Sequence, residues 1–225
     1  MNIDFTYIAI VLAVVFGSMV LHELMHGLTA YWLGDDTAKE NGRLTLNPIK
    51  HIDPVLTIAL PVLLVIMNGV THNTPIFGGA KPVPFRPDRV KGGEWGAALV
   101  GVAGPLTNLV LAFLFFIAAY FSGHLIIVGD AIFATSGVMS MFLNAGIMVN
   151  LGFFAFNMLP IPPLDGSRLL YAVAPTAIQR FMESMERIGI VVVFAILLIA
   201  SSFIGNILGG IIDFILKLFV AVLPI

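Results

Sequence analysis

Apolar runs long enough to cross a membrane alternate with short polar segments along the chain. A helix that spans a bilayer needs about 20 mostly apolar residues, and the first, third and fourth runs meet that length. The second run is shorter and carries Pro61 at its centre. The last two are separated by Gly205 and Asn206, which predicts a C-terminal helix pair. The runs cover residues 5–33, 54–70, 94–121, 136–159, 188–203 and 207–223.

The region between the first and third runs has a different pattern. Residues 71–92 contain four prolines and two adjacent glycines, which favours short strands at residues 76–77 and 83–85 over a helix. A single crossing by residues 54–70 would reverse the direction of every later helix. We therefore expect a re-entrant or interfacial hairpin there, with a true spanning helix as the alternative, and we interpret residues 54–92 as one insert.

Composition places the chain in a membrane. Hydrophobic residues make up 59% of its 225 residues and charged residues 11%, against roughly 25% charged in soluble domains. We predict an all-α membrane protein, a polytopic helical bundle with a three-helix catalytic core, a short strand or re-entrant region and a C-terminal helix pair. The net charge of −2 predicts no nucleic-acid partner, and the absence of cysteine excludes a thiolate metal site.

Basic residues indicate the orientation. Seven lie between the first and third runs, three follow the fourth, and none lies in residues 122–135. Because cytoplasmic loops carry the excess of Lys and Arg, we expect the N-terminus outside and the active site toward the cytoplasmic side. We expect a multi-pass protein of a prokaryotic cell membrane. The ten are Lys39, Arg43, Lys50, Lys81, Arg86, Arg89, Lys91, Arg168, Arg180 and Arg187.

A candidate metal motif lies in the first run. His22, Glu23 and His26 form an HExxH pattern, and on a helix two histidines four apart share one face and can both reach one zinc ion. Glu23 is then placed to act as the general base. A chance pattern of satisfied polar side chains is the alternative, but two histidines and a carboxylate inside a membrane are costly and indicate function.

A catalytic zinc site usually takes a third protein ligand. His51, His72 and His124 lie in loops, and we expect each to be solvated or interfacial. Asp165 is the better candidate, because it ends a stretch with three prolines, and irregular backbone at membrane depth needs a cavity or protein around it.

Three motifs together resemble the site-2 protease family of intramembrane zinc metalloproteases. They are HELMH at residues 22–26, GPLTN at 104–108 and FNMLPIPPLDG at 156–166. The resemblance implies one zinc ion per chain held by His22, His26 and Asp165, with Glu23 as general base and Asn157 in substrate handling. No PDZ-like domain and no extra helix before HELMH are present, and GRLTLNPIKHIDP at residues 42–54 fits a short branch of the family.

Other candidate residues carry weaker signals. Asn108 would contact substrate, orient an active-site group or make only an interhelical hydrogen bond. Gly79 belongs to a segment, residues 77–85, that resembles the family's strand region and would hold an unwound substrate. We expect the glycines of the third run to serve helix packing alone, and Asp213 and Lys217 to pair or to reach toward the membrane surface.

The function predicted from these residues is zinc-assisted hydrolysis of peptide bonds in membrane-embedded protein segments. Substrates would be single-span membrane proteins, in regulated intramembrane proteolysis, or signal-peptide remnants. A non-proteolytic membrane protein that binds or transports metal is the alternative. We expect residues 1–170 to form the catalytic core and residues 171–225 a C-terminal helical hairpin.

Overall fold

The computed structural model describes residues 5–53, 81–128, 131–189 and 201–223. Several predictions lie outside these ranges. They are the re-entrant hairpin at residues 54–70, the strand at residues 76–77, the positions of His72 and Gly79, and most of the apolar run 188–203.

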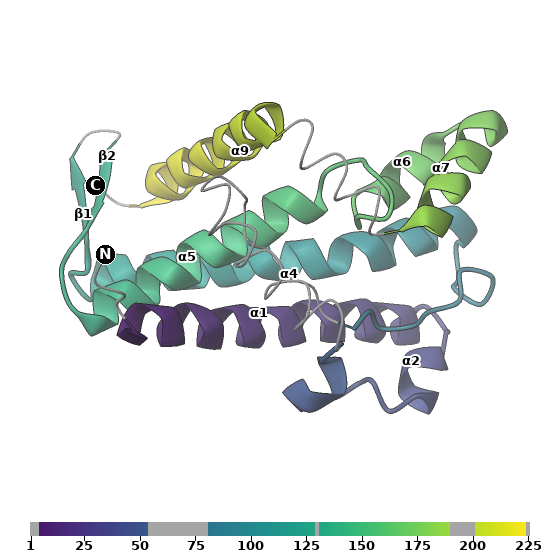
Figure 1. Ribbon diagram of the computed structural model, residues 1–225, viewed down its shortest axis with the longest axis horizontal. Coiled ribbons are helices and arrows are strands. Elements are labelled where there is room, and N and C mark those ends of the chain that lie inside the picture. The colour runs from purple at the N-terminus through teal and green to yellow at the C-terminus, as the bar shows by residue number, and fades with distance from the viewer. Residues whose placement is uncertain (1–4, 54–80, 129–130, 190–200, 224–225) are drawn as a thin grey trace, which may run out of the picture.

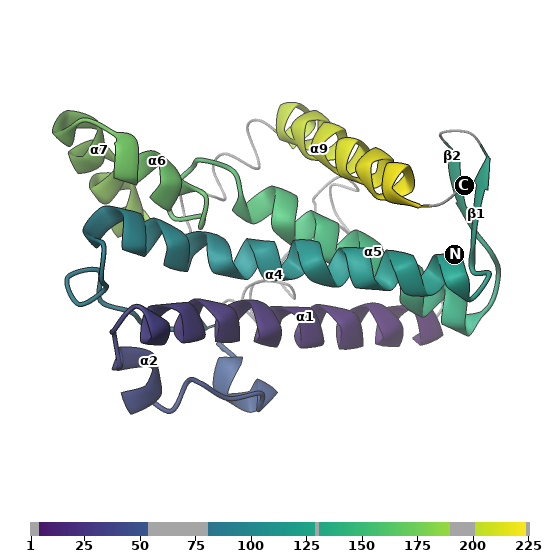
Figure 2. The same ribbon diagram turned by 180° about the vertical axis from the view of Figure 1, so that it is seen from behind.

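Three long helices form the body of the protein and lie side by side (Figures 1 and 2). They are α1 (Phe5–Trp32), α4 (Gly93–Phe121) and α5 (Val138–Asn157), and each packs on the other two. Helix α4 runs opposite to α1 and α5 (Figure 1). With α9 (Ser201–Val222), they are the four helices of the described chain that are long and apolar enough to span a bilayer. The prediction of an all-α, multi-pass membrane protein is confirmed.

Shorter elements gather at the two ends of the bundle (Figure 1). Helices α2 (Thr37–Glu40), α6 (Ser167–Val173) and α7 (Thr176–Ile188) lie at the end where α1 and α5 finish, and the 3₁₀ helix η1 (Pro48–His51) follows α2. A hairpin of β1 (Leu125–Val128) and β2 (Ala131–Ala134) lies at the other end. The Lys81 amide donates to the His51 carbonyl at 2.8 Å, so these two residues lie side by side.

The hairpin was not predicted, because residues 122–135 were interpreted only by their lack of basic charge. Its strands pair antiparallel, with Leu125 opposite Ala134 and Val128 opposite Ala131. Isoleucine and valine dominate β1, as is usual in strands. Each strand has only four residues, so the hydrophobic pattern of residues 125–134 was a weak signal beside those of the spanning helices.

Helix α9 corrects the predicted C-terminal boundary. It continues without a break through Gly205 and Asn206. In lipid, a helix that breaks exposes backbone groups with no water to bind them, so a weak helix former is tolerated. One face of α9 packs on α4 and α5, where Phe219 contacts the rings of Phe113 and Phe116.

Candidate active site

Two imidazoles from α1 and one carboxylate from the loop between α5 and α6 meet inside the bundle. His22 Nε2 lies 3.0 Å from His26 Nε2 and 3.1 Å from Asp165 Oδ2, and His26 Nε2 lies 3.4 Å from the same oxygen. A tetrahedral zinc ion with bonds of about 2.0–2.2 Å spaces its ligand atoms about 3.3–3.6 Å apart. One of the three separations lies in this range and the other two are about 0.2–0.3 Å shorter, so a small outward shift of the ligands would place the atoms at three corners of such a site. Among the described residues they form the one cluster that could hold a metal ion.

A tight loop returns Asp165 to the bundle. Helix α5 ends at Asn157, and the Gly166 amide donates to the Asn157 carbonyl at 2.6 Å. Position 166 has room only for glycine, because a Cβ there would overlap the backbone of Met158. The prolines at 160, 162 and 163 stop the helix from continuing. The broken helix end predicted from sequence is present, and it faces the two histidines.

The two imidazoles are oriented through their other nitrogens. His22 Nδ1 lies 2.6 Å from Asn108 Oδ1, and His26 Nδ1 lies 2.7 Å from the Val100 carbonyl oxygen, both on α4. A carbonyl accepts only, so His26 Nδ1 carries the proton and its Nε2 presents a lone pair. His22 likewise turns its Nε2 toward His26 Nε2 and Asp165.

A chain of side-chain amides determines which end of the Asn108 amide faces His22. Asn150 on α5 donates from Nδ2 to the Gly146 carbonyl at 2.8 Å, and its Oδ1 accepts from Asn108 Nδ2 at 2.8 Å. Because the Gly146 carbonyl cannot donate, each amide has one allowed orientation, and Asn108 must present its oxygen to His22. His22 therefore carries its proton on Nδ1, which leaves the Nε2 lone pair for a metal.

These contacts separate the interpretations of Asn108. Its side chain is fully buried and contacts His22, so it is an orienting residue for a candidate ligand, and burial leaves it no surface for substrate. Asn150 is equally buried and was missed. A signal was available, because Asn150, like Asn108, is an amide between apolar residues of a membrane helix, but Asn144 and Asn157 in the same helix share that signal.

Gly104, predicted to serve helix packing alone, lies against both histidines of the cluster. A Cβ at this residue would meet Nε2 of His26 and lie 2.6 Å from Nε2 of His22. The missing side chain thus leaves the space into which both candidate ligand atoms point. Proximity of one glycine to two histidines on another helix could not be deduced from sequence spacing.

Glu23 is half-buried beside the cluster and is bound by backbone. Its Oε2 accepts a hydrogen bond of 2.8 Å from the amide of Val83. The strand predicted at residues 83–85 is absent. Prolines at 82 and 84 cannot donate to a ladder, and the amide of Val83 is bonded to Glu23.

The remaining candidate residues have local partners. Asn157 is half-buried, and its Nδ2 donates to the Phe153 carbonyl at 3.0 Å. His51, expected to be solvated or interfacial, is fully buried, with Nε2 2.9 Å from the Thr45 carbonyl; the loop 42–53 folds inward around it. His124 is half-buried and lies 3.3 Å from the Thr135 hydroxyl.

Asp35, just beyond the end of α1, is a buried carboxylate. Burial alone would raise the pKa of Asp35, but hydrogen bonds from Thr37 and from the Arg86 amide outweigh it and lower the pKa below its ordinary value. Its charge is therefore stabilised by the surrounding donors, in the manner of a structural anchor.

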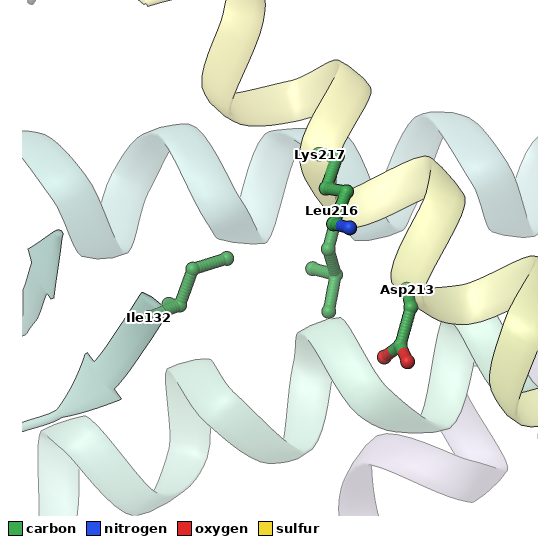
Figure 3. A pocket seen from close by; sticks show the side chains of 4 residues that line it. All are labelled: Ile132, Asp213, Leu216 and Lys217. Atoms are coloured by element: carbon green, nitrogen blue, oxygen red, sulfur yellow. The ribbon is translucent and has the colours of Figure 1, made fainter. Parts of the chain in front are cut away.

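A second polar region lies on α9, away from these residues. Asp213 and Lys217 line a cavity of about 340 Å³ with Leu216 and with Ile132 of β2 (Figure 3). They form no ion pair with each other or with another residue in the described chain, so the first of the two predicted alternatives is not observed, and reaching toward the membrane surface stays a prediction. No residue of the candidate metal cluster lines this cavity.

Comparison with known proteins gives the family. The model of peptidase family M50 matches residues 119–200. YwhC of Bacillus subtilis (strain 168), named as a candidate zinc metalloprotease, is 37% identical over 219 residues, which are 96% of this chain and 92% of that protein. Rip2 of Mycolicibacterium smegmatis (strain ATCC 700084 / mc(2)155), named in the same way, is 30% identical over 86% of this chain and 69% of its own length. No solved structure gives a significant match.

The chain therefore belongs to peptidase family M50, the site-2 protease family that its three motifs resemble. The prediction of a membrane-embedded peptidase is confirmed.

Proposed function

We propose that this protein hydrolyses peptide bonds in membrane-embedded protein segments, using one zinc ion held by His22, His26 and Asp165. The relatives YwhC and Rip2 carry zinc in their names, and a donor set of two imidazoles and one carboxylate suits zinc. Three protein ligands leave one position open, as catalytic sites require. The observation that carries the proposal is the convergence of three ligand atoms at 3.0–3.4 Å with both Nδ1 atoms bonded elsewhere.

When bound, zinc supplies a Lewis acid that polarises the scissile carbonyl and makes water nucleophilic near neutral pH. Glu23 accepts a proton from the attacking water and passes it to the leaving nitrogen. Asn108 and the Val100 carbonyl hold the imidazoles in the tautomer that binds metal. Asn157 and Gly79 are proposed to contact substrate.

Substrates reach this site from within the bilayer. His26 lies six residues before the end of α1 at Trp32, about 9 Å along a helix axis, so the cluster is below the surface at that end. The end carries the basic residues predicted to face the cytoplasm. We propose a prokaryotic cell membrane, an active site toward the cytoplasmic side, and single-span proteins or signal-peptide remnants as substrates.

We also propose that residues 1–170 are the catalytic core and that residues 171–225 form a C-terminal helical hairpin. The metal-transport alternative gains no support, because the described residues contain no second cluster of His, Asp or Glu that could pass an ion onward.

Reconstituted liposomes test the proposal. We expect cleavage of a fluorogenic single-span peptide, with Gly and Pro near its cytoplasmic third, at least tenfold faster than cleavage of the same residues as a soluble peptide. The Glu23→Gln protein is the control and should cut neither. Equal rates on both peptides would contradict a buried site.

A further inference from the structure

The segment from Lys81 to Arg86 is tied to α1 and to the loop after it by its backbone amides. Pro82 and Pro84 have no N–H. The Lys81 amide donates to the His51 carbonyl at 2.8 Å, the Val83 amide to Glu23 Oε2 at 2.8 Å, and the Arg86 amide to Asp35 Oδ2 at 2.6 Å. Along the segment, the Val83–Glu23 bond thus lies between two bonds to the loop after α1. Their acceptors, His51 and Asp35, belong to residues 35–53, which include the GRLTLNPIKHID stretch.

Val83 is the central contact of this segment. Its side chain is buried, whereas Lys81, Pro82, Pro84 and Arg86 are exposed. A Cβ added to Gly27, four residues after Glu23, would lie 3.0 Å from Val83 Cγ1. The side chain of Val83 therefore rests on α1 one turn beyond the carboxylate that its amide binds, which fixes the height of that amide above the helix.

Asp35 fastens the far end of the segment. It is fully buried, and its Oδ1 accepts from the Thr37 amide at 3.0 Å and from the Thr37 hydroxyl at 2.5 Å, so Oδ2 is left for Arg86. A buried carboxylate with three donors is rigidly held. The Lys91 amide, which donates to the Leu33 carbonyl at 2.8 Å, adds a second tie to the end of α1.

We infer that Asp35 is a positioning residue for Glu23, acting through the Arg86 amide and the Val83 amide. This inference rests on the proposed role of Glu23 as general base. The Val83 amide holds Oε2, which leaves the other carboxylate oxygen to exchange the proton. The amides of Lys81, Val83 and Arg86 are committed to this clamp, so of the backbone N–H groups of residues 81–86 only that of Phe85 has no partner among the described residues.

Paired substitutions at Arg86 test the clamp without touching a candidate catalytic residue. Arg86→Pro removes the N–H that binds Asp35, whereas Arg86→Ala keeps it and removes an exposed guanidinium with its exposed ion pair to Asp88. With the fluorogenic single-span peptide in liposomes, we expect Arg86→Pro to lower kcat at least tenfold, with KM within twofold of wild type and one zinc per chain. A misplaced catalytic group costs rate while substrate binding is kept. Arg86→Ala should stay within twofold of wild type in both constants.

Epistasis supplies the second measurement. Asp35→Ala and Val83→Pro should each lower kcat, and the double variant should be no slower than Val83→Pro alone, because both act through one hydrogen bond. If Asp35→Ala does not fold, the Arg86 pair decides. Equal kcat for Arg86→Pro and Arg86→Ala would overturn the inference. So would a fold-loss of kcat in the Asp35→Ala, Val83→Pro double variant equal to the product of the two single losses. Full activity of Glu23→Gln would instead overturn the proposed function, so the two failures are distinguishable.

Discussion

Polar residues interrupt apolar helices in two regions of this protein, with opposite consequences. In the three-helix core, Asn108 and Asn150 are fully buried, and a chain of hydrogen bonds links α5, α4 and α1. On α9, Asn206, Asp213 and Lys217 are exposed, and within the described chain they form no ion pair or side-chain hydrogen bond with another helix.

The residue types are similar, so the difference lies in what packs against them. A polar group at membrane depth is costly unless a neighbouring helix supplies a partner. In the core, His22, Asn108 and Asn150 are joined by hydrogen bonds, which offset this cost and fix the geometry at the histidines. We therefore expect function where polar groups are bonded between helices, and three pairs of matched substitutions test this contrast.

Glycine gives the largest expected difference. Gly104→Ala would place a methyl group in overlap with both Nε2 atoms, whereas Gly209 has no atom within 4 Å of an added Cβ. We expect Gly104→Ala to lose zinc and at least 99% of its peptide cleavage, and Gly209→Ala to keep both. Metal content and turnover of the two purified proteins check this. A Gly104→Ala protein with full zinc content would show that the candidate ligands meet elsewhere.

Asparagine gives an intermediate difference. Asn150→Leu removes the acceptor of Asn108 Nδ2, so the Asn108 side chain can rotate and turn its NH₂ group toward His22. That orientation favours the tautomer with the proton on Nε2, which cannot bind a metal through that nitrogen. Loss of such an outer hydrogen bond costs about 10–100-fold in metal affinity. Chelator competition should reveal this loss in Asn150→Leu and no change beyond twofold in Asn206→Leu. Unchanged zinc affinity in both variants would remove the amide chain from the account.

Aspartate gives the smallest difference, in stability. Asp35→Asn should lower the free energy of unfolding by about 2 kcal/mol at pH 7, since it loses charge-assisted hydrogen bonds. The folded pKa of Asp35 is depressed, so the stability it contributes is complete above the unfolded pKa and is lost as pH falls below about 4 toward the folded pKa. The gap between wild type and variant should shrink over that range. Thermal melts in detergent at several pH values check it, and Asp213→Asn, which changes an exposed group, should show no such gap.

Sequence alone was sufficient for features with a strong local signal. The lengths of α1, α4 and α5 follow from lipid thickness, and the spacing of His22 and His26 follows from the helix period. The proline-rich end of the fourth apolar run pointed to Asp165, which the structure brings to the two histidines.

Features that depend on contacts between distant segments could not be predicted. Gly104 faces the histidines because of how α4 is rotated against α1, and the Val83 amide reaches Glu23 across 60 positions of sequence. His51 looks like a loop residue until the loop is seen to fold inward around it. In each case tertiary packing decides what local composition leaves open.

Metal content of the Glu23→Gln and Asp165→Ala proteins, measured with their turnover of a single-span peptide, tests the central claim most directly. Glu23 is proposed to move protons and Asp165 to hold zinc. We therefore predict one zinc per chain and no cleavage for Glu23→Gln, and neither zinc nor cleavage for Asp165→Ala. A Glu23→Gln protein without zinc, or an Asp165→Ala protein with full activity, would contradict the assignment.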